Sequence, residues 1–134
     1  MIGENYVSFE VAKLLKEKGF DEITFTWYTG KGKLCFGRNT YDDYHMNHFS
    51  NILSGKEKDK CSAPTLSVVM KWLREEKGVA VIPVLSSVLD NKKFLWDIKI
   101  VVAETNDTYS QGWVYEKQED ACEAAIKYCL DNLI

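Results

Sequence analysis

Apolar residues recur at the helical spacing in three parts of the chain, and the first two parts carry clear boundary signals. The three parts are residues 9–18, 64–77 and 118–133. Ser8 stands where an N-cap is expected, and Gly19 follows the first apolar stripe as a stop signal. Gly78 ends the second part in the same way. The pattern therefore predicts three amphipathic helices.

The helix expected at residues 64–77 has the clearest apolar stripe. The stripe consists of Leu66, Val69, Met70 and Leu73, at i, i+3, i+4 and i+7. Pro64 suits the first helical turn, where its missing N–H costs nothing. The stripe favours a structural role against a sheet. Trp72 lies off the stripe centre, which leaves room for a partly exposed aromatic side chain that binds a partner.

Strand patterns occupy most of the remaining chain. The segments are residues 23–28, 34–37, 79–85, 94–104 and 109–116. In the first, Ile23, Phe25 and Trp27 alternate with Thr24, Thr26 and Tyr28. In the fourth, one face carries Phe94, Trp96, Ile98, Ile100 and Val102, and the other carries Asp97 and Lys99. Pro83 cannot donate a ladder hydrogen bond, so its strand is expected at a sheet edge or beside a bulge.

Short turns between these strands predict antiparallel pairing, including a hairpin around Gly30 and Gly32. The expected order is α-β-β-(loop)-α-β-β-β-α. We predict an α+β fold with one antiparallel sheet of about five strands and helices packed mainly on one face. Residues 1–134 are expected to form a single domain, with a less regular connecting segment at residues 38–60.

Charge and cysteine content narrow the classes of function. The net charge is −3, and the negative balance lies in residues 61–134, which disfavours nucleic acid as a partner. The four cysteines form no CxxC pair. The start of the chain lacks a basic segment followed by an apolar run, so we expect no secretory signal, no membrane segment and a cytoplasmic location. No motif predicts a cofactor.

Three stretches carry a resemblance to a known group of proteins. They read YVSFEVAKLLKEKGFDE at the start, SAPT and KWLRE in the centre, and DACEAAIKYCL at the end. In these stretches, about half of the chain, the sequence resembles small proteins of gut Bacteroidetes and their phages or mobile elements. The resemblance implies a bacterial or phage cytosolic setting and brings no catalytic residues with it.

The sharpest candidate for metal chemistry is the segment DDYHMNH. Asp42, His45 and His48 stand three residues apart, so on a helix they would share one face and could bind a divalent metal, with Cys35 or Cys61 as a fourth ligand. The HExxH spacing and its glutamate base are absent. The same residues also suit a plain polar loop, which is the favoured interpretation.

Catalysis by a nucleophile has little support in the sequence. Cys61 is the one thiol expected near a helix start, with Lys58 and Lys60 before it, but no base partner can be identified. The favoured interpretation of Cys61 is a small residue packed at the start of a helix. No serine lies in a GxSxG elbow, the motif of a serine nucleophile. We therefore expect a protein that is not an enzyme.

Two binding functions remain. The α-β-β-β-α order of residues 64–134 is that of double-stranded-RNA-binding domains, but Glu116, Glu119 and Asp120 stand where such domains carry lysines. An accessory protein that acts by binding another protein is favoured, with a homodimer left open. Its candidate aromatic anchors, each of which could equally belong to the core or a sheet face, are Trp27, Tyr28, Tyr41, Tyr44 and Trp113.

Overall fold

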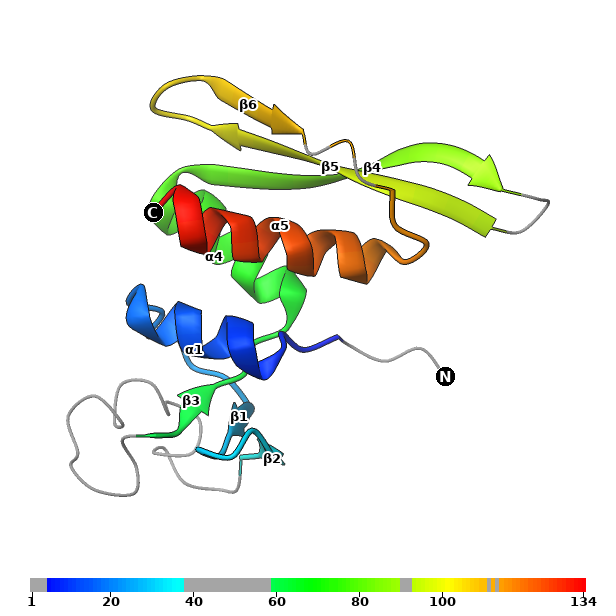
Figure 1. The fold of residues 1–134 in the computed structure, drawn as a ribbon. Coiled ribbons are helices and arrows are strands. Elements are labelled where there is room, and N and C mark those ends of the chain that lie inside the picture. Colours follow the sequence, from blue (N-terminus) through cyan, green and yellow to red (C-terminus); the bar gives the residue numbers. More distant parts are fainter. Residues whose placement is uncertain (1–4, 38–58, 90–92, 111, 113) are drawn as a thin grey trace. The chain divides into compact units, whose positions relative to one another are not determined.

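The computed structural model describes residues 5–37, 59–89, 93–110, 112 and 114–134 (Figure 1). The chain divides into two compact units, Met1–Thr65 and Leu66–Ile134. Both units combine helix with antiparallel sheet, so the expected α+β class is confirmed. Whether the two units behave as one domain stays a prediction. Among the described residues, no helix has the length and apolar character needed to cross a membrane.

Unit 1 begins with helix α1 (Phe9–Glu17), whose boundaries agree closely with the sequence prediction. The Ser8 hydroxyl accepts a hydrogen bond from the Val11 N–H at 3.2 Å, which confirms the N-cap. At the other end Gly19 has a φ of 89°, and the Phe20 N–H donates to the Leu15 carbonyl at 2.9 Å. This closure buries the Phe20 side chain completely, as a helix stop with a following apolar residue should.

The sheet of unit 1 has the strand order β2-β1-β3 and consists of β1 (Thr26–Tyr28), β2 (Leu34–Phe36) and β3 (Cys61–Ser62). The antiparallel pairing of β1 with β2 confirms the predicted hairpin. Its turn is closed by the Thr29 N–H donating to the Lys33 carbonyl, and Gly32 adopts a φ of 85°. Strand β3 was not predicted, because two residues are too few to show a period.

Strand β1 and the residues just before it bury their hydroxyl-bearing side chains. Thr24, Thr26 and Tyr28 are buried, whereas Ile23 and Phe25 are 57% and 74% exposed. Each of these three hydroxyls donates to a backbone carbonyl: Thr24 to Thr26, Thr26 to Ala63, and Tyr28 to Val7. An alternating strand ordinarily buries its apolar face. The reversal is possible here because carbonyl acceptors remove the cost of burying the polar groups.

Unit 2 begins with helix α4 (Leu66–Lys77), which starts after Pro64 rather than at it. The Pro64 carbonyl instead accepts a hydrogen bond from the Val7 N–H at 3.0 Å, and the next residue, Thr65, forms an isolated antiparallel bridge with Tyr6 in unit 1. Leu66, Val69 and Leu73 are buried as the stripe predicted. Trp72 is only 6% exposed, so the expectation of a partly exposed ring was wrong: the apolar stripe is wider than the i, i+3, i+4 spacing indicated.

The sheet of unit 2 has the order β4-β5-β6, formed by β4 (Val79–Leu89), β5 (Lys93–Val102) and β6 (Asp107–Ser110). Strand β4 pairs with β5 alone among the described strands, which confirms the edge position predicted from Pro83. The register of this pairing shifts between Leu85 and Ser87, and the strand then continues to Leu89, beyond its predicted end. Strand β6 is shorter than predicted and ends before Gly112.

Helix α5 (Gln118–Asn132) completes unit 2. Its buried stripe matches the sequence prediction except at the half-buried Leu133, and comprises Ala121, Cys122, Ala125, Ile126, Cys129 and Leu130. Helices α4 and α5 contact each other and the sheet, and Figure 1 shows both on the same face of it. Ile98 and Ile100 on β5 and Val79 and Val81 on β4 lie in this core, 0 to 4% exposed.

The described strands form two three-stranded sheets, where the sequence predicted one sheet of about five strands. Each sheet is built around pairing of strands that are neighbours in the sequence: β1 with β2, β4 with β5, and β5 with β6. Alternation identifies such hairpins, but it carries no information on whether two distant hairpins share hydrogen bonds. Most of the less regular segment predicted at residues 38–60 lies outside the described residues.

Candidate functional site

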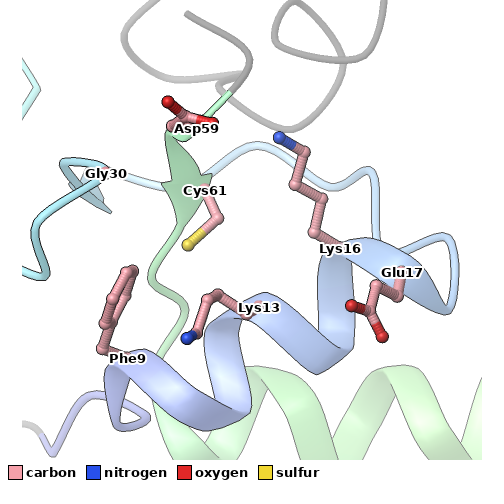
Figure 2. A pocket seen from close by; sticks show the side chains of 7 residues that line it. All are labelled: Phe9, Lys13, Lys16, Glu17, Gly30, Asp59 and Cys61. Carbon is pink, nitrogen blue, oxygen red and sulfur yellow. The ribbon is translucent and has the colours of Figure 1, made fainter.

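A pocket of about 410 Å³ lies in unit 1, between helix α1 and strand β3 (Figure 2). It is lined by Phe9, Lys13, Lys16, Glu17, Gly30, Asp59 and Cys61. The four helical residues follow the i, i+4, i+7, i+8 spacing, which places them on one side of α1. The pocket is therefore a consequence of an amphipathic helix packing its polar edge beside a short strand.

The charges around this pocket are balanced. Two lysines face one glutamate and one aspartate among its lining residues. The Lys16 Nζ donates to the Lys60 carbonyl at 2.9 Å, and the Lys13 Nζ lies 4.5 Å from the centroid of the Phe9 ring. Both ammonium groups thus have partners in the protein, so the lining residues that the structure describes offer no concentrated positive charge to an anionic ligand.

Cys61 is the only thiol in the pocket wall, and it is almost fully buried at 1% exposed. Burial raises the pKa of its thiol to about 11, although the charges of Lys16 and Lys13 act in the opposite direction. The thiol is therefore protonated at neutral pH, whereas a nucleophile needs the thiolate. The expected position beside a helix start was wrong, because Cys61 lies on β3 and α4 begins only at Leu66.

A second candidate surface lies in unit 2, at the end of the β4–β5 ribbon. We call residues 85–89 and 93–96 the ribbon tip. Helices α4 and α5 cover the opposite half of the ribbon, and Figure 1 shows both strands continuing past the start of α5. Large apolar side chains of the tip are consequently exposed by 42 to 61%, namely Leu85, Val88, Leu89 and Phe94.

A cavity of about 300 Å³, open to solvent on one side, lies between the ribbon tip and the segment before α5. It is lined by Leu89, Lys93, Phe94, Leu95, Trp96, Glu116 and Lys117. The backbones of Trp96 and Tyr115 exchange two hydrogen bonds of 2.7 and 2.8 Å, which fix the segment before α5 against the ribbon. The Phe94 and Trp96 rings meet edge to face, with centroids 6.3 Å apart. The result is an apolar hollow with two lysines and one glutamate around it.

The predicted aromatic anchors lie in different surroundings. Tyr28 is buried and its hydroxyl donates to the Val7 carbonyl at 2.6 Å, so it offers little surface to a partner. Trp27 is half-buried, with the Lys60 Nζ 4.9 Å from its ring centroid, and its buried indole N–H has no acceptor among the described residues. The other three predicted anchors, Tyr41, Tyr44 and Trp113, lie outside the described residues.

The predicted metal ligands Asp42, His45 and His48 also lie outside the described residues, so this site stays a prediction. Within the part of the chain that the structure describes, no three His, Cys, Asp or Glu side chains are grouped in a way that could hold a metal ion. Of the two thiols considered as a fourth ligand, Cys61 is buried and Cys35 is half-buried on β2.

Sequence reasoning missed the ribbon tip. The strand prediction stopped at Leu85, although Val88 and Leu89 follow two serines and carry apolar side chains. This second apolar pair, which comes before the next turn, could have predicted that the strand continues. The sequence does not show that these side chains lie beyond the helices. That depends on where α5 lies along β4, which only the folded structure determines.

Comparison with known proteins adds no family to this description, since no family model, no curated protein and no solved structure matches the chain.

Proposed function

We propose that this protein is a small accessory protein that binds another protein through the ribbon tip. The observation that carries the proposal is the group of exposed apolar side chains around the tip cavity. Apolar side chains gathered beside a hollow are typical of a surface that receives an anchor residue of a partner. The resemblance to proteins of gut Bacteroidetes and their phages supports a bacterial cytoplasm as the place of this interaction.

The charges at the tip indicate the chemistry of the partner. Lys93 and Lys117 line the cavity with Glu116 as the one acidic residue among the described lining, so that described lining has an excess of positive charge. An apolar segment that carries an acidic residue would complement both features. We therefore expect the partner to place an apolar side chain in the cavity and a carboxylate beside the lysines.

Affinity capture from a lysate of a gut Bacteroidetes strain tests this function. The capture compares the wild-type chain with Phe94→Ser, and uses Phe25→Ser as the matched control because Phe25 is an exposed phenylalanine of unit 1. We expect one stoichiometric protein that survives nuclease treatment, is lost with Phe94→Ser and is retained with Phe25→Ser. Capture that is equal for all three chains would contradict binding at the tip.

The same experiment addresses binding of double-stranded nucleic acid. The described order α4-β4-β5-β6-α5 favours this second function, since it is the order found in double-stranded-RNA-binding domains. The acidic residues Glu119 and Asp120 in the first turn of α5 oppose it, because they would repel phosphates. Capture that disappears on nuclease treatment would favour nucleic acid over a protein partner.

The charge argument has its own test. The double variant Lys93→Glu, Lys117→Glu reverses the excess charge at the cavity while leaving its apolar residues in place. We expect the affinity for the captured partner to fall by about tenfold or more, and to become less sensitive to salt. An unchanged affinity would contradict the expected acidic residue of the partner, but not its apolar anchor.

A further inference from the structure

The sheet of unit 2 has a second face, which points away from helices α4 and α5. Ile98 and Ile100 of β5 are buried toward the helices, so alternation turns their neighbours to this outer face. The β4–β5 register then identifies the residues of β4 that lie beside them. The outer face carries Ala80, Ile82 and Val84 on β4 and Leu95, Asp97, Lys99 and Val101 on β5.

This outer face has the wrong composition for a face that meets only water. An antiparallel sheet with one solvated face ordinarily shows polar residues there. Here Ile82 and Val84 are 42% and 41% exposed, and Leu95 and Val101 are further apolar members of the same face. The charged members are Asp97 and Lys99, two positions apart on β5, and the β5–β6 register adds the polar Thr108 and Ser110 of β6 to the same face.

The arrangement of these residues is self-complementary. In the register, Lys99 pairs with Ile82 and Asp97 pairs with Val84, so each charge has an apolar neighbour on β4. A second copy can be turned about a twofold axis that lies parallel to the sheet, perpendicular to the strands, and passes between Asp97 and Lys99. This operation places the Asp97 of each copy opposite the Lys99 of the other, and Ile82 opposite Val84.

We propose that a second copy of this chain covers the outer face, giving a symmetric dimer in which the two sheets pack face to face. Two sheets packed in this way lie about 10 Å apart, with their strands nearly aligned. An in-plane twofold axis parallel to the strands and running along β5 would place Lys99 opposite Lys99 and Asp97 opposite Asp97. The charges therefore select one of the two symmetric arrangements, and the apolar residues supply the buried area.

The Asp97 carboxylate is held in place by two hydrogen bonds within the chain. Its Oδ1 accepts the Ile98 N–H at 2.7 Å and its Oδ2 accepts the Ser110 hydroxyl at 3.3 Å. A carboxylate has further acceptor capacity beyond these two bonds, so it can also receive a lysine. Leu95 belongs to both the outer face and the ribbon tip, so the two proposals are separated by residues that belong to one surface only: Phe94 for the partner, and Asp97, Lys99 and Ile82 for the dimer.

A charge-swap series measured by analytical ultracentrifugation tests the dimer. We expect the wild-type chain to have twice its 15.4 kDa mass at micromolar concentration. Asp97→Lys and Lys99→Asp each replace two attractive contacts by two repulsive ones, so each variant alone should weaken the dimer by about tenfold or more. The double variant, D97K with K99D, restores opposite charges across the axis and should dimerise within about threefold of wild type.

Two further variants keep the test decisive. Lys71→Asp changes an exposed lysine of α4 and should leave the dimer unchanged. Ile82→Lys should dissociate the dimer although Asp97 and Lys99 are unchanged. This variant tests the dimer even if circular dichroism shows that Asp97→Lys does not fold. A wild-type chain that is monomeric at about 100 μM, or a dimer that persists in both single charge variants and in Ile82→Lys, would overturn the proposal.

Discussion

Strand β1 of unit 1 and strand β5 of unit 2 both alternate, yet they bury chemically different faces. On β1 the inward side chains are Thr26 and Tyr28, and their hydroxyl groups donate to backbone carbonyls of other segments. On β5 the inward side chains are Ile98 and Ile100, which pack under two helices. The difference shows that a strand buries the face for which the surrounding segments provide a partner, whether a carbonyl or an apolar surface.

The largest expected effect concerns the buried apolar side chains of β5. Ile100→Ala removes a fully buried side chain from the core of unit 2 and should lower the free energy of unfolding by about 2–5 kcal/mol. The matched control is Val68→Ala, which truncates a 42% exposed residue of α4 and should change it by about 0.5 kcal/mol or less. Urea unfolding followed by circular dichroism measures both, and similar losses would contradict the described core.

The next largest effect concerns the buried hydroxyl groups of β1. Thr26→Val keeps the shape of the side chain but takes away the donor to the buried Ala63 carbonyl, so it should destabilise the protein by about 1–3 kcal/mol. Hydrophobicity alone predicts the opposite sign, because valine is the more apolar residue. Phe25→Thr, at an exposed position, should cost about 0.5 kcal/mol or less in the same assay. A stabilising Thr26→Val would show that β1 does not bury this face.

The smallest effect compares the first helix of unit 1 with the last helix of unit 2. Helix α1 has a side-chain N-cap in Ser8, whereas α5 begins after Lys117 without a side-chain cap hydrogen bond. Ser8→Ala should therefore lower stability by about 1 kcal/mol, and Lys117→Ser should raise it by a similar amount. The thermal unfolding midpoints of the two variants should move in opposite directions. A lower midpoint for Lys117→Ser would contradict the conclusion that α5 lacks a side-chain cap.

Much of the ribbon itself could be predicted from the sequence, and the candidate site on it could not. The turns and alternation placed β4 and β5 together, and Pro83 placed β4 at an edge. The exposure of Val88 and Phe94 depends on where α5 begins relative to the ribbon, which no local pattern contains. The aromatic residues chosen from sequence included Tyr28, whose burial depends on an acceptor at Val7, a distant position in the chain.

The sequence by itself determined the kind of every described element except β3, and the approximate ends of the helices and of β1, β2 and β5, because helix period, caps, turn glycines and strand alternation are set by residues close together in the chain. The Ser8 cap and the stripe of α5 are examples. Only the tertiary structure decided which face of β1 is buried, that Trp72 joins the core, and that Cys61 pairs as a strand beside Tyr28. These outcomes depend on contacts between segments far apart in the sequence, whose free energies no local pattern records.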